Sequence, residues 1–233
     1  MHAFHPSCFN SVDGKSTCTK CGNKVVKNGK TAHGNQRYWC RFCQTSKVLF
    51  VKQNGFGSIF DKQIVQLTKE GNGIRSTARI LTISPATILR KLLRIAKTIQ
   101  PPTIPVNLKR IQVDELHTII QNKKREIYVI YSWSQELKRV LTLAIGTRSK
   151  NNLRLVVDPL LAANAQTINT DGYSGYIGVV TKNIHTTFKT RNNGIERQNL
   201  NLRTHLKRLN RRTICFSKSS LILEAILKIY CWS

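Results

Sequence analysis

Apolar residues recur at intervals of three and four between residues 60 and 98, which predicts amphipathic helices. Gly71 and Gly73 interrupt the first helix, and Ser84 followed by Pro85 forms an N-cap and first-turn pair for the last one. We therefore predict a helix-turn-helix domain over residues 56–99. A plain helical bundle with a solvated basic face stays the alternative. The periodic positions are Ile64, Leu67, Ile74, Ala78, Ile80, Leu81, Ile88, Leu92 and Ile95.

The pattern changes after the proline-rich segment 100–105, which cannot continue a helix because proline lacks an N–H and restricts the residue before it. We place a domain boundary there. Apolar runs at residues 111–120, 125–133 and 139–146 predict strands. A helix over 152–165, a short strand at 167–171 and a long helix from about 193 to 209 are expected to follow. We assign residues 106–233 to a second large domain.

The first 52 residues have few aliphatic side chains and need a stabilising cross-link in place of a large core. Their cysteines form the pattern C-x2-C-x18-C-x2-C, in which two tight turns each offer two thiolates to one tetrahedral ion. We predict a structural zinc ribbon over residues 1–52. Its ligands are Cys18, Cys21, Cys40 and Cys43.

Charge gives the first indication of a partner. The chain has 38 Lys and Arg against 11 Asp and Glu, a formal charge of +27, which favours a polyanion. No apolar run approaches the roughly 20 residues that cross a bilayer, and residues 1–8 do not resemble a secretory signal. We expect a cytoplasmic protein that is not associated with a membrane.

Acidic residues are scarce in the C-terminal half. Asp114 lies inside an apolar strand, Asp171 follows the next short strand, and Glu196 opens a basic helix. Converging carboxylates can hold the two divalent ions of a phosphoryl-transfer site. Successive strand residues face opposite sides, so we expect that Asp114 and Glu115 cannot both point into one site. From spacing alone, solvated or ion-paired carboxylates remain the alternative.

The basic residues expected to contact DNA fall into two groups. One group lies in the helix-turn-helix segment and reaches a groove or its phosphates. The other lies on and after the helix that begins near residue 193, along the DNA backbone. Together with one threonine they are Arg75, Thr87, Arg90, Lys91, Arg94, Arg197, Arg203, Lys207, Arg208, Arg211 and Arg212.

Three segments resemble the transposases of the insertion-sequence-one family: VDE at 113–115, TDGYSGY at 170–176 and IERQNLNLRTHLKRL at 195–209. The N-terminal zinc ribbon and helix-turn-helix segments are also similar to that family. The resemblance implies an α+β multidomain protein with a C-terminal ribonuclease-H-like catalytic domain built on a mixed sheet. It also implies a DDE triad of Asp114, Asp171 and Glu196, with Arg203 near the DNA.

The function implied by this resemblance is DNA transposition. The protein would bind terminal inverted repeats and catalyse metal-dependent strand cleavage and strand transfer, with two Mg²⁺ or Mn²⁺ ions and one structural Zn²⁺. Its partners would be double-stranded DNA and further copies of itself, in a homodimer or a larger synaptic complex. The resemblance also implies a prokaryotic protein associated with the nucleoid. Two alternatives stay open: a DNA-binding transcriptional regulator with an inactive catalytic half, and a nuclease or resolvase of the same fold.

Overall fold

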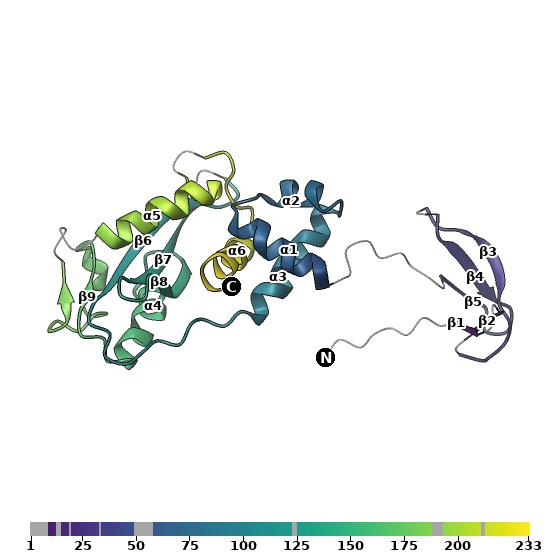
Figure 1. Cartoon of the computed structure of the whole chain (residues 1–233), viewed down its shortest axis with the longest axis horizontal. Helices are drawn as coiled ribbons and strands as arrows, with labels where there is room; N and C mark the ends of the chain where they lie inside the picture. Colours follow the sequence, from purple (N-terminus) through teal and green to yellow (C-terminus); the bar gives the residue numbers. More distant parts are fainter. Residues whose placement is uncertain are drawn as a thin grey trace. The chain divides into compact units, whose positions relative to one another are not determined.

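A computed structural model describes residues 9–12, 15–18, 20–32, 34–48, 58–122, 125–187, 193–210 and 213–233. The chain divides into two compact units, residues 1–56 and 57–233 (Figure 1). Each unit is described by itself below. No helix in the described ranges is both long enough and apolar enough to span a membrane.

The N-terminal unit contains two small antiparallel sheets. Strands β1 (Phe9–Val12) and β2 (Lys15–Cys18) form a hairpin, and β3 (Val26–Lys30), β4 (Gln36–Cys40) and β5 (Thr45–Val48) form a second sheet. Side chains of β3 are exposed along its whole length. The buried centre of the unit is made mainly by cysteines, as its composition predicted.

The larger unit opens with the predicted helical segment. Helices α1 (Ser58–Lys69), α2 (Ile74–Ile80) and α3 (Pro85–Thr98) follow one another with short turns. Ser84 caps α3 by accepting a hydrogen bond from the Thr87 N–H at 3.1 Å. Gly71 occupies the left-handed region at φ +74°, and a Cβ there would clash with the carbonyl oxygen of His205, so the turn needs glycine.

A five-stranded mixed sheet forms the rest of the unit, in the order β10-β9-β6-β7-β8. Its strands are β6 (Ile111–Ile119), β7 (Glu126–Ser134), β8 (Arg139–Gly146), β9 (Ile168–Asn169) and β10 (His185–Thr186). Neighbours among β6, β7 and β8 run antiparallel, whereas β9 runs parallel to both β6 and β10. The three long strands confirm the predicted runs within one or two residues.

The two faces of the sheet carry different cores. On one face, helix α4 (Lys150–Ala162) packs over β8 and β7. On the other face lie α5 (Asn193–His205) and α6 (Ser220–Trp232), with the short 3-10 helix η3 (Lys207–Leu209) after α5. A Cβ at Gly194 would lie 2.6 Å from Gln112 Oε1, so this glycine lets α5 approach the sheet closely.

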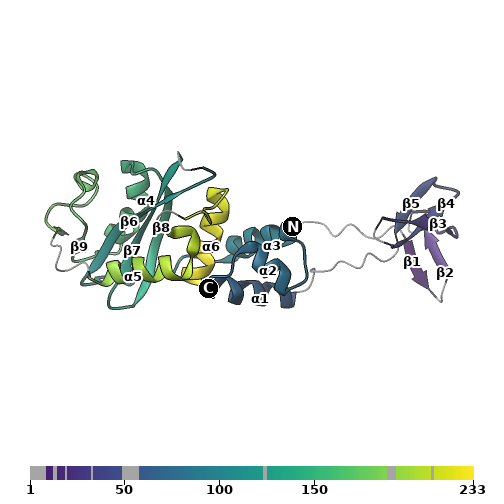
Figure 2. The same cartoon turned by 90° about the horizontal axis from the view of Figure 1, so that it is seen from above.

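Helix α6 joins the helical segment to the sheet. Figures 1 and 2 both show it between β8 and the helices α1 and α3. Its indole at Trp232 donates to the Val140 carbonyl at 3.0 Å. One continuous apolar cluster therefore includes Ile64 and Leu92 of the helices, Val140 of the sheet and Ile226 of α6. The separate domains over residues 56–99 and 106–233 stay a prediction, although both belong to this one compact unit.

Candidate functional site: a four-cysteine cluster and an acidic cluster

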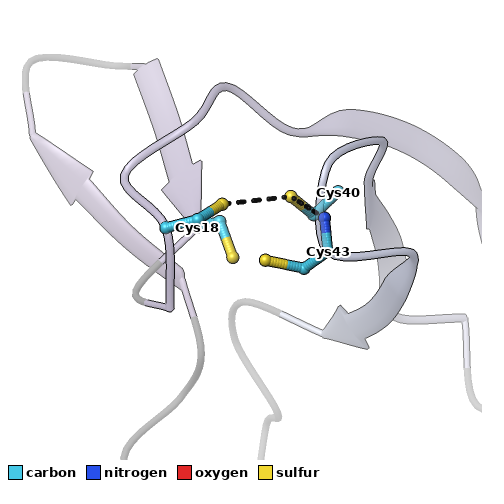
Figure 3. Close-up of side chains that lie close together, drawn as sticks. Cys18, Cys40 and Cys43 are labelled. Carbon is cyan, nitrogen blue, oxygen red and sulfur yellow. Dashed lines mark hydrogen bonds between the residues drawn. The ribbon is translucent and has the colours of Figure 1, made fainter.

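Four thiols converge in the N-terminal unit. The sulfur atoms of Cys18, Cys21, Cys40 and Cys43 all lie within 4.8 Å of one another (Figure 3). The Cys21 and Cys40 sulfurs are 3.6 Å apart, and the Cys43 N–H points at Cys40 Sγ at 3.4 Å. Such N–H···S contacts stabilise thiolates at metal knuckles.

The cluster fits zinc. Four thiolates around one tetrahedral Zn²⁺ at 2.3 Å would have sulfurs roughly 3.8 Å apart, which matches the observed spread. The Asn23 backbone N–H lowers the pKa of the Cys21 thiol to about 6, whereas its hydrogen bond with Cys21 raises the pKa of Cys43 to about 12. The four converging thiols are consistent with a zinc ribbon.

A second cluster lies in the larger unit, where the parallel pair β6 and β9 ends. β9 pairs with β6 at Ile111 and Gln112, and the chain leaves β9 toward Asp171. Carboxylate oxygens of Asp114, Glu115 and Asp171 all lie within 4.8 Å of one another. Asp171 is the most exposed of the three acids, because it stands in the loop before η1 (Ser174–Tyr176).

The grouping of Asp114 with Glu115 corrects the expectation that one site could not hold both. The two side chains do start on opposite faces, because Asp114 contacts Asn199 on the α5 side and Glu115 contacts Arg148 on the α4 side. Their carboxylates can still approach each other, because β6 pairs with β9 only as far as Gln112 and both acids lie beyond that point. The Asp114 carboxylate then folds along the strand and accepts from the Glu115 N–H at 2.8 Å.

Burial governs the charge state of this cluster. Loss of water raises the pKa of Asp114 and of Glu115 above their ordinary values, and hydrogen bonds from Asn199 and Tyr176 oppose the rise. The Glu115 side chain is 1% exposed, and its Oε1 has no partner with full hydrogen-bond geometry among the described residues. Asp171 adds like charge. A bound cation would therefore stabilise the charged forms of the three carboxylates.

Arg148 is the cation that the chain itself supplies. Its Nη2 lies 3.0 Å from Glu115 Oε2 and 3.7 Å from Asp171 Oδ2. The guanidinium carbon lies 3.7 Å from the centre of the Tyr173 ring, a close cation–π stack. Tyr173 also donates its hydroxyl to the Arg148 carbonyl at 3.3 Å.

Glu196 is not a member of the acidic cluster in the described residues. It lies exposed in the first turn of α5. Asn199, three residues later on the same side of the helix, reaches the cluster instead: its amide donates to Asp114 Oδ2 at 2.6 Å and accepts from the Tyr131 hydroxyl at 2.7 Å. The role of Glu196 as third member of a triad thus stays a prediction.

The donor set suits a hard divalent cation. Mg²⁺ and Mn²⁺ prefer carboxylate oxygens, and the three acids bring such oxygens within 4.8 Å of one another. The cluster is consistent with catalytic divalent metals held by Asp114, Glu115 and Asp171.

Comparison with known proteins decides the family. A family described as IS1 transposase matches residues 108–232, the part of the chain that carries the sheet, α5 and the acidic cluster. The chain belongs to the IS1 transposase family.

Relatives within the IS1 family match the same half. The chain is 34% identical over 116 residues to the insertion element iso-IS1n protein InsB of Shigella dysenteriae, covering 50% of this chain and 88% of that protein. It is 29% identical over 119 residues to the IS1 protein InsB of Shigella flexneri, covering 51% of this chain and 91% of that protein. An InsB protein of Escherichia coli K12 matches at 29% over 71% of its length.

The predicted DNA-facing residues of this IS1 family member on α2 and α3 differ in their surroundings. Arg75 and Arg90 are exposed, and Thr87 is half-buried against the Ser84 cap. Arg94 is 56% exposed but lies 2.6 Å from Asp61. Lys91 differs most from expectation: its side chain is only 6% exposed, and its ammonium lies 2.8 Å from Asp61, so it faces the protein interior.

The second basic group lies on α5 and η3. Arg197 and Lys207 are exposed, Arg203 is half-buried, and Arg208 is half-buried with a donor 2.9 Å from Ser217 Oγ. Arg211 and Arg212 lie outside the described residues.

A cavity of about 760 Å³ joins the two basic groups. Arg75 on α2 and both Lys207 and Arg208 on η3 line it, over an apolar floor that includes Leu89 and Ile226. Helices far apart in the sequence therefore present cations to one surface.

Three contributors to the acidic cluster escaped the sequence reasoning: Glu115, Arg148 and Asn199. Glu115 was set aside by strand alternation. Asn199 lies three residues after Glu196, on the same face of a helix, and this spacing could have linked it to the site. Arg148 lies two residues after β8 and precedes the Ser149 cap of α4, but its acidic partners Glu115 and Asp171 are far away in the sequence, so spacing gave no indication.

Proposed function

We propose that this IS1 family member is a DNA transposase that binds the terminal inverted repeats of an insertion sequence and catalyses metal-dependent strand cleavage and strand transfer. The observation that carries the proposal is the acidic cluster of Asp114, Glu115 and Asp171 inside the segment that matches the family. The sheet order, with antiparallel β6, β7 and β8 followed by parallel β9 and β10, supports a ribonuclease-H-like catalytic domain.

In the proposed mechanism the chain's residues hold and orient the reacting groups. Divalent ions, when bound, would polarise the attacked phosphate and stabilise the charge that develops on the oxygens in line. Asp114 and Asp171 would be the main ligands, as the family resemblance implies. Glu196 would complete the triad from α5, since Asn199 on the same helical face already reaches Asp114.

DNA recognition is proposed for the basic surfaces. Arg75 and Arg90 on the helix-turn-helix are exposed and free to approach a groove, while Arg197 and Lys207 would track the phosphate backbone. Lys91 is the least accessible member of the predicted set, because its ammonium lies 2.8 Å from Asp61. Zinc would order the N-terminal ribbon as a further DNA-binding module. Assembly of a dimer or larger complex would bring two ends together.

The deciding experiment incubates the full zinc-loaded chain with labelled duplexes carrying the inverted repeats that flank its gene, with Mg²⁺ or Mn²⁺. We expect nicked and joined strands on a denaturing gel. Asp171→Asn should abolish both products while leaving DNA binding intact, and Asp158→Asn, on the exposed side of α4, serves as the matched control. Cleavage retained in Asp171→Asn would refute the site.

The same assay distinguishes the alternative functions and tests which residue supplies the third carboxylate. Nicking without joined strands would favour a nuclease or resolvase, and binding without any cleavage would favour a regulator. A loss of cleavage in Glu196→Gln comparable to that in Asp171→Asn would support the proposed triad. Full activity in Glu196→Gln together with loss in Glu115→Gln would assign the third carboxylate to Glu115.

Binding should also depend steeply on salt, because the proposed partner is held through phosphates. We expect the logarithm of affinity for duplex DNA to fall linearly with the logarithm of salt concentration. A flat response in a filter-binding titration would contradict a role for the +27 charge.

A further inference from the structure

The main chain of Arg148 is held by contacts on both sides, and its side chain contacts the acidic cluster. It immediately precedes Ser149, the N-cap of α4, whose hydroxyl accepts from the Asn152 N–H at 3.4 Å. The Tyr173 hydroxyl holds the Arg148 carbonyl from the other side. Rotation about side-chain bonds can therefore move the guanidinium without moving the main chain.

The oxygens that Arg148 contacts are those available to a divalent ion. Glu115 Oε2 and Asp171 Oδ2 face the guanidinium, while the other oxygen of Asp171 already accepts from the Tyr173 N–H at 2.9 Å. A divalent cation and a guanidinium within a few ångströms of the same carboxylates repel each other. Both cannot keep their full contacts with these acids at once.

One buried donor at this place, Arg148 Nε, lacks a partner with full hydrogen-bond geometry among the described residues. Glu115, in contrast, already interacts with the Tyr176 hydroxyl. Native proteins rarely leave a buried donor unsatisfied. An anionic oxygen such as a phosphate would satisfy Arg148 Nε.

We propose that Arg148 is a positioning residue that acts as an internal cation: it occupies the acidic cluster in the resting protein and yields Glu115 and Asp171 to the divalent metal when a DNA phosphate draws its guanidinium away. This inference rests on the proposed function. Metal and DNA would then bind with positive coupling, since each removes the obstacle to the other. The cluster would be fully metal-loaded only in the presence of substrate.

The test measures Mn²⁺ affinity of the full, zinc-loaded chain without DNA, by calorimetry and by the electron paramagnetic resonance signal of free Mn²⁺. We expect Arg148→Gln to bind Mn²⁺ at least tenfold more tightly than the unchanged chain, because the competing cation is gone. Arg154→Gln removes the same charge from the exposed side of α4 and should leave the affinity unchanged.

A second variant keeps the charge and removes its support. Tyr173→Leu deletes the ring beneath the guanidinium and the hydroxyl bond to the Arg148 carbonyl. We expect several-fold tighter Mn²⁺ binding, and this variant decides the question if Arg148→Gln does not fold, as judged by circular dichroism. Affinity equal to or weaker than that of the unchanged chain, in whichever folded variant is measured, overturns the role of Arg148.

The DNA-cleavage assay keeps the two proposals distinguishable. Metal-dependent cleavage by the unchanged chain, with no gain of Mn²⁺ affinity in the variants, would remove Arg148's role and leave the transposase proposal standing. Absence of both Mn²⁺ binding and cleavage in the unchanged chain would overturn the metal site itself, and with it both proposals.

Discussion

The link between α5 and the acidic cluster can be tested through Asn199. Replacing it by alanine removes the 2.6 Å hydrogen bond to Asp114 and leaves the Tyr131 hydroxyl with only a 3.4 Å contact to the Ile195 carbonyl. A hydrogen bond to a charged group contributes about 1.5–3 kcal/mol. Because Asp114 is only partly buried, we expect Asn199→Ala to lower the free energy of unfolding by about 2 kcal/mol. The fully buried Tyr131 hydroxyl should add a loss of up to about 1 kcal/mol.

Urea unfolding followed by helical circular dichroism measures this loss, since all described helices belong to the larger unit. Tyr131→Phe and the double variant complete a double-mutant cycle, and the two losses should add to more than the loss in the double variant. Asn199→Asp has the same shape but places a second carboxylate against Asp114. The two negative charges repel each other, so this variant should lose more unfolding free energy than Asn199→Ala at neutral pH. A loss below about 0.5 kcal/mol in Asn199→Ala, the level typical of an ordinary surface change, would refute the link.

The remaining predictions concern three other places. Cys40→Ser should abolish the binding of one Zn²⁺ per chain, measured by metal analysis, and leave the helical circular dichroism unchanged, because the ribbon is a separate unit. Lys91→Met should destabilise the larger unit less than Asp61→Ala, since the latter strands a buried ammonium; equal losses in urea unfolding would contradict the internal role of Lys91. Burial lowers the pKa of His185, so stability should be full above its ordinary value and fall as the pH drops below about 6.5, where the unfolded chain gains a proton that the native chain resists. Thermal unfolding of His185→Gln should show a smaller decline over that interval, and an identical decline would exclude His185 as its source.

Local signals predicted most of the secondary structure. The interrupted periodicity between residues 60 and 98 correctly indicated α1, α2 and α3, and the Ser84–Pro85 pair correctly located the start of α3. Helix α5 ends at His205 and is followed by a 3-10 turn, so the predicted helix to residue 209 was too long.

Long-range packing explains what the sequence did not predict. Helix α6 is apolar on most sides because it is enclosed by β8, α1 and α3, and it therefore lacks the one-sided pattern that marks a surface helix. The pairing of Lys91 with Asp61, 30 residues away, was likewise invisible in the periodicity of α3.

The acidic cluster shows a different limit. Strand alternation correctly put Asp114 and Glu115 on opposite faces, but it carries no information on where the neighbouring strand ends. β9 is only two residues long, and past its end a side chain from either face can reach the same point. Predicting this would require the length of β9, which its sequence does not delimit.

Helix α6 sets the order in which the larger unit can become rigid. It is the last described helix in the sequence, yet it fills the space between the helices α1 and α3 and the sheet. During synthesis, α1 and α3 are made long before α6, which covers them. The sheet packs against the same late helix. The protein therefore cannot hold helices α1 to α3 and its acidic cluster in fixed register until residues 220–232 have been added, which ties the ordering of both parts to one late folding step.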